Sequence, residues 1–178
     1  MNWRKLIVCC ALTALCSVPS WAGSFGVYGS YWNPDEVDSN FGAGARVGFD
    51  FVKFLELEFH GTYYPSFEAE GLTGPVDIRA TPVDGGLRIN FIPEGHFNPY
   101  IGAGATEYFL NSDDGNIDNE TGWYGEAGFA AGGDHTKFFA EVMWRKLDTT
   151  ISFGDFDEVH TNFDGFGINV GANWTWGR

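Results

Sequence analysis

The stretch "GFGINVGANWTWGR", Gly165–Arg178, alternates between two kinds of residue. Every second position from Phe166 to Trp176 is apolar, whereas the positions between them, from Gly165 to Thr175, are small or polar. Such a period of two indicates a β-strand whose two faces meet different surroundings. The fold therefore depends on which face lies against an apolar medium.

Seven further segments alternate in the same way, and no sustained helical period follows Gly23. They span residues 24–32, 41–50, 54–64, 81–91, 99–109, 122–132 and 138–147. Clusters of Asn, Asp, Gly and Pro separate them, as expected between strands and hairpins. The sequence thus predicts eight antiparallel strands joined as an up-and-down meander.

The predicted connections alternate between short and long. The short ones cover 51–53, 92–98 and 133–137, and the long ones cover 33–40, 65–80, 110–121 and 148–162. The long loops hold 14 of the 24 acidic residues and one basic residue, Arg79. A meander with one plain rim and one elaborated rim is typical of a closed barrel, and strands of about ten residues are long enough to cross a bilayer.

Two kinds of barrel fit this pattern. A soluble, lipocalin-like barrel packs its apolar face inward around a ligand, whereas a membrane barrel turns that face outward to lipid. The apolar face carries aromatic rings near both ends of nearly every strand, too many and too large for an eight-stranded interior. Facing outward, they would form the two aromatic girdles of a membrane protein. The predicted fold is all-β: an eight-stranded antiparallel transmembrane β-barrel over residues 23–178, with the last segment paired to the first.

Charged residues share the other face with the glycines, and so are expected in the lumen. These residues are Arg46, Glu56, Glu58, His60, Asp84, Arg88, Glu126, Glu141 and Arg145. They could form a proton or cation pathway or an acid–base pair. The favoured interpretation is a salt-bridged plug, because small barrels are filled and buried charges require partners. Glu141 and Arg145 are too far apart on one strand to pair directly, so their partners are expected on neighbouring strands, with Glu126 as a candidate for Arg145.

Two charged residues fall on lipid-facing positions, Glu107 and Lys146. Both lie near the long-loop end of their strands, where a charge costs about 0–1 kcal/mol. Alternatively, a β-bulge turns Glu107 inward.

The first 22 residues have the features of a cleaved signal peptide. Arg4 and Lys5 precede an apolar run, Leu6–Val18, and Ser20-Trp21-Ala22 is a small-x-small cleavage site. A lipoprotein signal at Cys16 is the alternative, but Leu15 is large for the position before it. All three cysteines, Cys9, Cys10 and Cys16, lie in this segment, so the mature chain is expected to contain no disulfide and no thiolate metal site. Its net charge of about −16 argues against nucleic acid as a partner.

Three further motifs are informative: "NPYIGAG" (98–104), "WYGEAGFAAG" (123–132) and "AEVMWRKLD" (140–148). In these motifs the chain resembles the small outer-membrane β-barrels of Gram-negative bacteria, the OmpA/OmpX/OmpW-like group. The end is similar to the assembly signal of that family, with Gly171, Trp174 and Trp176 at its key positions; Val170 and the added Gly177-Arg178 depart from the usual pattern.

This resemblance implies an outer-membrane location, with lipids and lipopolysaccharide as surroundings and periplasmic chaperones and the barrel-assembly machinery as partners during biogenesis. It also implies a monomer with periplasmic termini. The expected role is structural or surface interaction without catalysis, with a narrow channel for small or hydrophobic solutes as the alternative. A lipid A-modifying enzyme is less favoured, because His160-Thr161-Asn162 lacks the serine of the lipid A deacylases.

No cofactor and no metal centre are expected, because none of the four histidines pair at the spacing of a transition-metal site. The acidic loop "NSDDGNIDNE" (111–120) does not match an EF-hand, since Leu110 and Thr121 occupy the first and last ligand positions. Divalent cations could still bind this loop through Asp113, Asp114, Asp118 and Glu120, and cations on acidic loops could bridge to lipopolysaccharide.

Overall fold

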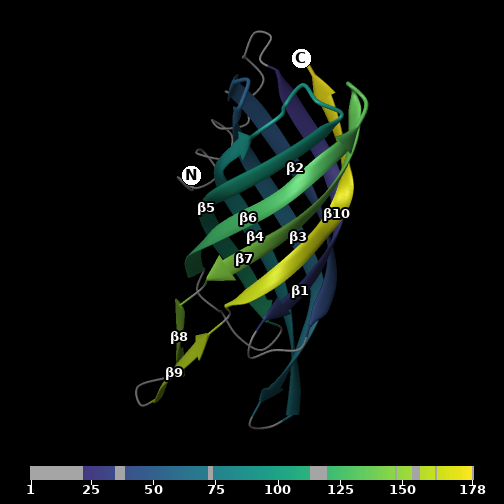
Figure 1. Ribbon diagram of the computed structural model, residues 1–178. Helices are drawn as coiled ribbons and strands as arrows, with labels where there is room; N and C mark the ends of the chain where they lie inside the picture. The colour runs from purple at the N-terminus through teal and green to yellow at the C-terminus, as the bar shows by residue number, and fades with distance from the viewer. Residues whose placement is uncertain are drawn as a thin grey trace, which may run out of the picture.

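The computed structural model describes residues 22–34, 39–71, 74–112, 120–146, 148–153, 157–162 and 164–177. The expected signal peptide, apart from Ala22, lies outside these ranges. Eight strands close a barrel in the order β1-β10-β7-β6-β5-β4-β3-β2 (Figure 1). Their bounds are β1 Gly23–Pro34, β2 Asn40–Val52, β3 Leu55–Gly71, β4 Gly74–Asn90, β5 Phe97–Ser112, β6 Glu120–Gly132, β7 Thr136–Lys146 and β10 Gly165–Trp176.

The predicted pairing of the first and last segments is confirmed. β10 runs antiparallel to β1 from Gly23 opposite Trp176 to Pro34 opposite Gly165. Because the barrel is closed, it has no edge strand with unpaired backbone groups. Such an edge would not be stable inside a bilayer. Within the described part of the chain, no helix is long and apolar enough to cross a membrane.

The predicted facing of the strands is also confirmed. In β7 the exposed residues Phe138, Val142 and Trp144 alternate with the buried residues Glu141 and Arg145. The outer face carries the large apolar side chains, with Phe41 72% and Phe138 68% exposed in the isolated chain. This outer face is therefore the surface expected to meet lipid.

Glu107 keeps its place on the outer face. It lies opposite Val83 on β4 and Thr121 on β6, and the register of β5 is continuous through this position. The alternative of a bulge that turns Glu107 inward is therefore wrong.

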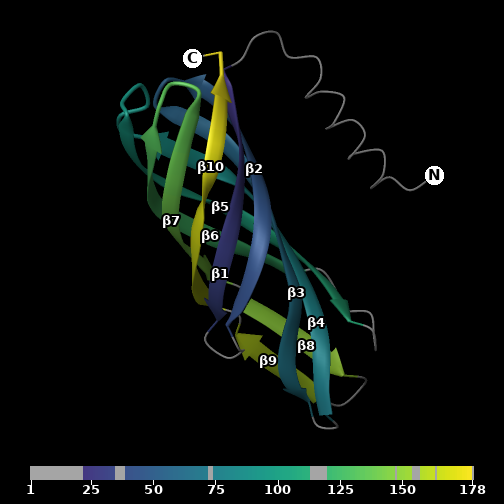
Figure 2. The same cartoon turned by 90° about the vertical axis from the view of Figure 1, so that its right-hand side faces the viewer.

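The two ends of the barrel differ. Short turns and the C-terminal end of β10 lie at one end, called here the short-turn end, and the opposite long-loop end carries extensions of the sheet (Figure 2). The prediction of a loop over 65–80 is wrong, because β3 and β4 continue as a hairpin to Gly71 and Gly74. The expected loop 148–162 likewise contains a two-stranded sheet of β8, Asp148–Phe153, and β9, Asp157–Asn162.

Glycines on the inner face make room for aromatic rings. A Cβ atom at Gly44 would overlap the ring of Tyr28, and one at Gly86 would lie 2.5 Å from the Tyr124 hydroxyl oxygen. A narrow interior can hold such large side chains only where the opposing position has none. The glycines of the inner face therefore set the packing of the lumen.

Candidate functional site: the lumen

Three aromatic side chains fill the lumen near the long-loop end. The ring of Trp32 on β1 lies 5.3 Å from that of Tyr64 on β3 and 5.9 Å from that of Tyr108 on β5, measured between centroids. All three side chains are buried. Rings at such distances attract one another and exclude water between them.

An ion pair crosses the barrel next to this aromatic layer, on the side of the short-turn end. Arg145 on β7 donates from Nη2 to Asp84 Oδ2 on β4 at 2.7 Å. Asp84 also accepts from Thr106 at 2.6 Å, and both charged side chains are at most 1% exposed. The suggested pairing of Arg145 with Glu126 is wrong. The partner lies across the lumen rather than on a neighbouring strand, because β7 and β4 are separated by β6 and β5.

The centre of the lumen holds a cluster of three carboxylates and two guanidinium groups: Glu58, Glu126, Glu141, Arg46 and Arg88. Arg46 Nη1 lies 2.9 Å from Glu141 Oε2, and Arg88 Nη2 lies 2.5 Å from Glu58 Oε2 and 2.9 Å from Glu126 Oε1. The guanidinium groups also lie over aromatic rings, Arg46 3.4 Å from the Phe139 centroid and Arg88 4.1 Å from the Tyr100 centroid. Both contacts, the ion pair with a carboxylate and the cation–π contact with a ring, stabilise a buried guanidinium group.

Glu141 has the most hydrogen bonds of the three carboxylates. It accepts from Arg46, from the Tyr100 hydroxyl at 2.7 Å and from Asn169 at 2.9 Å. These donors come from β2, β5 and β10, so one carboxylate connects strands on different sides of the barrel. Such a saturated acceptor is suited to fixing the interior in one arrangement.

His60 lies beside this cluster and is buried. Its Nε2 atom is 3.2 Å from Glu58 Oε2, and its ring lies 6.2 Å from those of Tyr28 and Tyr124, between centroids. Its other ring nitrogen, Nδ1, has no hydrogen-bond partner. The position of His60 among carboxylates distinguishes it from a histidine packed in an apolar core.

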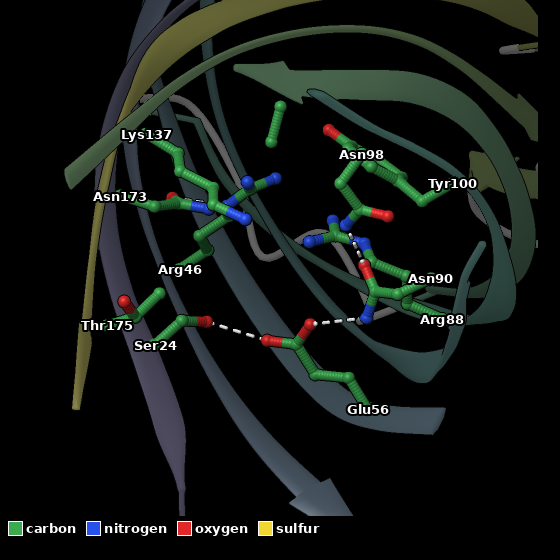
Figure 3. A pocket seen from close by; sticks show the side chains of 11 residues that line it. Ser24, Arg46, Glu56, Arg88, Asn90, Asn98, Tyr100, Lys137, Asn173 and Thr175 are labelled. Atoms are coloured by element: carbon green, nitrogen blue, oxygen red, sulfur yellow. Dashed lines mark hydrogen bonds between the residues drawn. The ribbon is translucent and has the colours of Figure 1, made fainter. Parts of the chain in front are cut away.

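The short-turn end of the lumen is polar and contains a cavity of about 20 Å³. Figure 3 shows a run of hydrogen bonds along its wall: Ser24 donates to Glu56, which accepts from Asn90, and Asn90 in turn accepts from Asn98. Lys137 extends into the same region and donates to the backbone oxygens of Pro93 and Gly95. Such a volume accommodates about one water molecule.

All nine charged residues expected in the lumen are buried there. Lys137, Trp32 and Tyr64 were not singled out from the sequence. The predicted strand begins at residue 138 and leaves Lys137 in a short turn, although Lys137 continues the inward alternation of Phe139 and Glu141. Extending the period by one position would have placed it in the lumen.

Outside the membrane-spanning part, Lys53 and Glu94 form an exposed ion pair of 2.7 Å between two short turns. The hydrogen bond raises the pKa of Lys53 and lowers that of Glu94. Screening by water leaves such a pair little influence on stability.

The residues of the expected assembly signal lie on β10. Trp174 and Trp176 are on the outer face, each 44% exposed, and Gly171 faces inward against β1. Residues 113–119 of the acidic loop lie outside the described residues, as does the side chain of His160.

Comparison with known proteins places this architecture among bacterial barrels. The outer membrane protein beta-barrel domain family matches residues 8–175. The structure is similar to the outer membrane protein OprG of Pseudomonas aeruginosa, with a TM-score of 0.72 and 19% identity over 88% of this chain and 97% of that one.

Two further solved structures are similar in fold. The N-terminal β-barrel domain of Pseudomonas aeruginosa OprF has a TM-score of 0.58 and 14% identity, over 87% of this chain and 97% of that one. Neisserial surface protein A has a TM-score of 0.59 and 13% identity, over 88% of this chain and 96% of that one. Among curated protein sequences, none matches the chain significantly. At these identities the neighbours bear on the fold alone.

Proposed function

Because the chain belongs to the outer membrane protein β-barrel domain family and is an outer-membrane protein, we propose that it is a closed, non-conducting barrel with a structural or surface-interaction role. Structural, adhesive and channel-like members all occur among barrels of this family. The choice between these roles depends on the lumen.

One observation carries the proposal: charged side chains cross the lumen in pairs at two levels. Arg145 and Asp84 meet beneath the aromatic layer, and Arg46 and Glu141 meet at 2.9 Å in the central cluster. Each pair joins strands three places apart in the barrel, so it obstructs the axis rather than lining the wall. A permeating ion would have to separate buried partners, which costs about 3–5 kcal/mol per broken pair.

The remaining space supports the same conclusion. The cavity at the short-turn end has room for about one water molecule, and Trp32, Tyr64 and Tyr108 fill the opposite end. A barrel of eight strands encloses little more than its own side chains.

The long-loop end is the surface available for interaction. The β3–β4 hairpin and the β8–β9 sheet extend the molecule there, and outer-membrane barrels direct their longer loops to the cell exterior (Figure 2). Catalysis is not part of the proposal, since barrels of this family are mostly non-enzymatic.

Single-channel recording tests the proposal. Protein extracted from the outer membrane is incorporated into a planar bilayer, and the current of the wild type is compared with that of the double variant Arg145→Ala/Arg46→Ala, which breaks the crossing pair at each level. We expect no discrete steps from the wild type and steps from the double variant, in which Asp84 and Glu141 lose their partners and the obstruction shrinks. Steps of defined conductance from the wild type would instead establish the narrow channel.

A further inference from the structure

The central cluster contains more carboxylates than guanidinium groups. Three carboxylates, Glu58, Glu126 and Glu141, face two guanidinium groups, Arg46 and Arg88. Glu141 is saturated with donors, whereas each of the other two carboxylates keeps one oxygen without a hydrogen-bond or ion-pair partner, Glu58 Oε1 and Glu126 Oε2. Leaving a buried carboxylate oxygen without a partner is costly, so Glu58 and Glu126 are the carboxylates with room for a further ligand.

His60 completes a set of three ligand atoms at this point. One ligand atom from each of Glu58, His60 and Glu126 lies within 4.8 Å of the others, and all three residues are buried. Two ligands of a tetrahedral ion are about 3.4 Å apart, given metal–ligand bonds of about 2.0–2.2 Å. The ligand atoms that are farthest apart would have to approach by up to about 1.4 Å to bind one ion.

A second group points to a ligand independently of the carboxylates. The Tyr124 hydroxyl is fully buried and has no hydrogen-bond partner. It lies against Gly86, and Gly86 is the register partner of Glu58. The Tyr124 ring lies 6.2 Å from that of His60, between centroids, and the Tyr124 hydroxyl and the free carboxylate oxygens of Glu58 and Glu126 are polar atoms that a bound ion would satisfy.

We propose that Glu58, His60 and Glu126 bind one divalent transition-metal ion of the zinc class inside the lumen, with the Tyr124 hydroxyl beside it. An imidazole nitrogen with carboxylate oxygens suits such ions, whereas calcium and magnesium favour oxygen ligands alone. Arg88 contacts Glu58 Oε2 and Glu126 Oε1 and would orient the carboxylates from outside the ligand set.

The ion would act as a cross-brace of the barrel. Glu58 and His60 lie on β3 and Glu126 lies on β6, strands separated by β4 and β5. An ion that binds the folded state but not the unfolded chain stabilises the fold. This inference rests on the closed interior proposed above. Its test measures bound metal rather than ionic current, so either proposal can fail alone.

The experiment supplies the metal while the lumen is being formed. Protein extracted from the outer membrane is unfolded in urea with chelator, refolded in detergent micelles with Zn²⁺ or Co²⁺, and passed through a gel-filtration column. Elemental analysis is expected to find about one ion per chain, and the Co²⁺ protein is expected to show the intense visible absorption of a four-coordinate site.

Matched variants locate the ion. His60→Ala and Glu126→Gln are expected to lose it, whereas His135→Ala, an exposed turn histidine, and Glu56→Gln, a lumen carboxylate outside the ligand set, are expected to retain it. A folded state is recognised by the shifted mobility of the unboiled protein in gel electrophoresis.

Absence of a retained ion in the wild type would overturn the proposal. An ion that survives His60→Ala would equally overturn it and assign binding to the acidic loops. If the variants do not fold, the wild-type Co²⁺ spectrum decides: weak bands typical of six oxygen ligands would exclude the site.

Discussion

Arg145 on β7 and Asp84 on β4 meet across the lumen, with Nη2 and Oδ2 2.7 Å apart. Arg145 makes a second contact through Nε at 3.3 Å from Asp84 Oδ1. Both side chains are at most 1% exposed, so neither charge can be solvated if the other is removed. The pair therefore couples opposite walls of the barrel.

Breaking this pair from one side should destabilise the barrel strongly. Asp84→Asn leaves the Arg145 guanidinium buried without its countercharge, and the expected loss is about 3–5 kcal/mol in the free energy of unfolding. Urea unfolding in lipid vesicles, followed by tryptophan fluorescence, measures it. Lys53→Ala, which removes the exposed pair with Glu94, serves as the control and should leave the midpoint unchanged. Equal midpoints for Asp84→Asn and wild type would show that the crossing pair does not hold the walls together.

The close approach of Tyr28 to Gly44 makes a second prediction. Gly44→Ala places a methyl group within the volume of the Tyr28 ring, and the expected cost is about 1–3 kcal/mol. Gly29→Ala is the matched control. Gly29 pairs with Ala43, next to the Tyr28–Gly44 pair, and a Cβ atom at Gly29 would meet nothing within 4 Å on the outer face. Thermal unfolding followed by band shift compares the two variants. A control as unstable as Gly44→Ala would mean that glycine matters there for backbone reasons rather than for ring packing.

The sequence predicted the barrel closely because its evidence is local. The alternation of Phe166, Ile168 and Val170 with Gly167 and Asn169 depends only on which face meets lipid, and the structure has the same facing. Strand number and closure followed from the repetition of that pattern. These features required no knowledge of which side chains meet in the interior.

Contacts across the lumen could not be predicted in the same way. Arg145 pairs with Asp84, and His60 lies near Glu126, because strand order and tilt bring together residues separated by two intervening strands. A sequence search for two histidines at metal-ligand spacing cannot detect the proposed ligand set, because its residues come from two strands that are not neighbours in the barrel.

The hairpin beyond the barrel was missed for a different reason. Phe67 lies opposite Ile78 and Ala69 opposite Val76, so the period of two continues past the expected strand ends. Pro65 cannot donate to the sheet, and the register shifts between Tyr64 and Phe67. This irregularity, followed by Gly71, Gly74 and Pro75, resembles a loop in the sequence.

The depth in the bilayer of a charged residue on the outer face should determine how much it lowers the free energy of unfolding. Val142 lies midway along β7 and is 51% exposed, and Val142→Arg is expected to cost about 2–4 kcal/mol. Glu107→Arg, near the long-loop end of β5, should change stability by about 0–1 kcal/mol. Unfolding in vesicles measures both. Similar costs at the two positions would contradict the assignment of the outer face to lipid.

Substitution of Trp176 can distinguish an effect on barrel assembly in the cell from an effect on the stability of the folded barrel. It lies opposite Gly23 at the seam where β10 meets β1, and it is 44% exposed on the outer face. Because it is the final aromatic residue of the expected assembly signal, Trp176→Ala should lower the amount of folded barrel in the outer membrane several-fold. Once refolded from urea, the variant should unfold within about 1 kcal/mol of wild type, since an interfacial side chain loses little burial. Phe41→Ala, an outer aromatic residue at the other end of the barrel, is the control. A wild-type level of folded Trp176→Ala in cells would show that the residue has no part in recognition, and a large loss of stability after refolding would assign the defect to the fold itself.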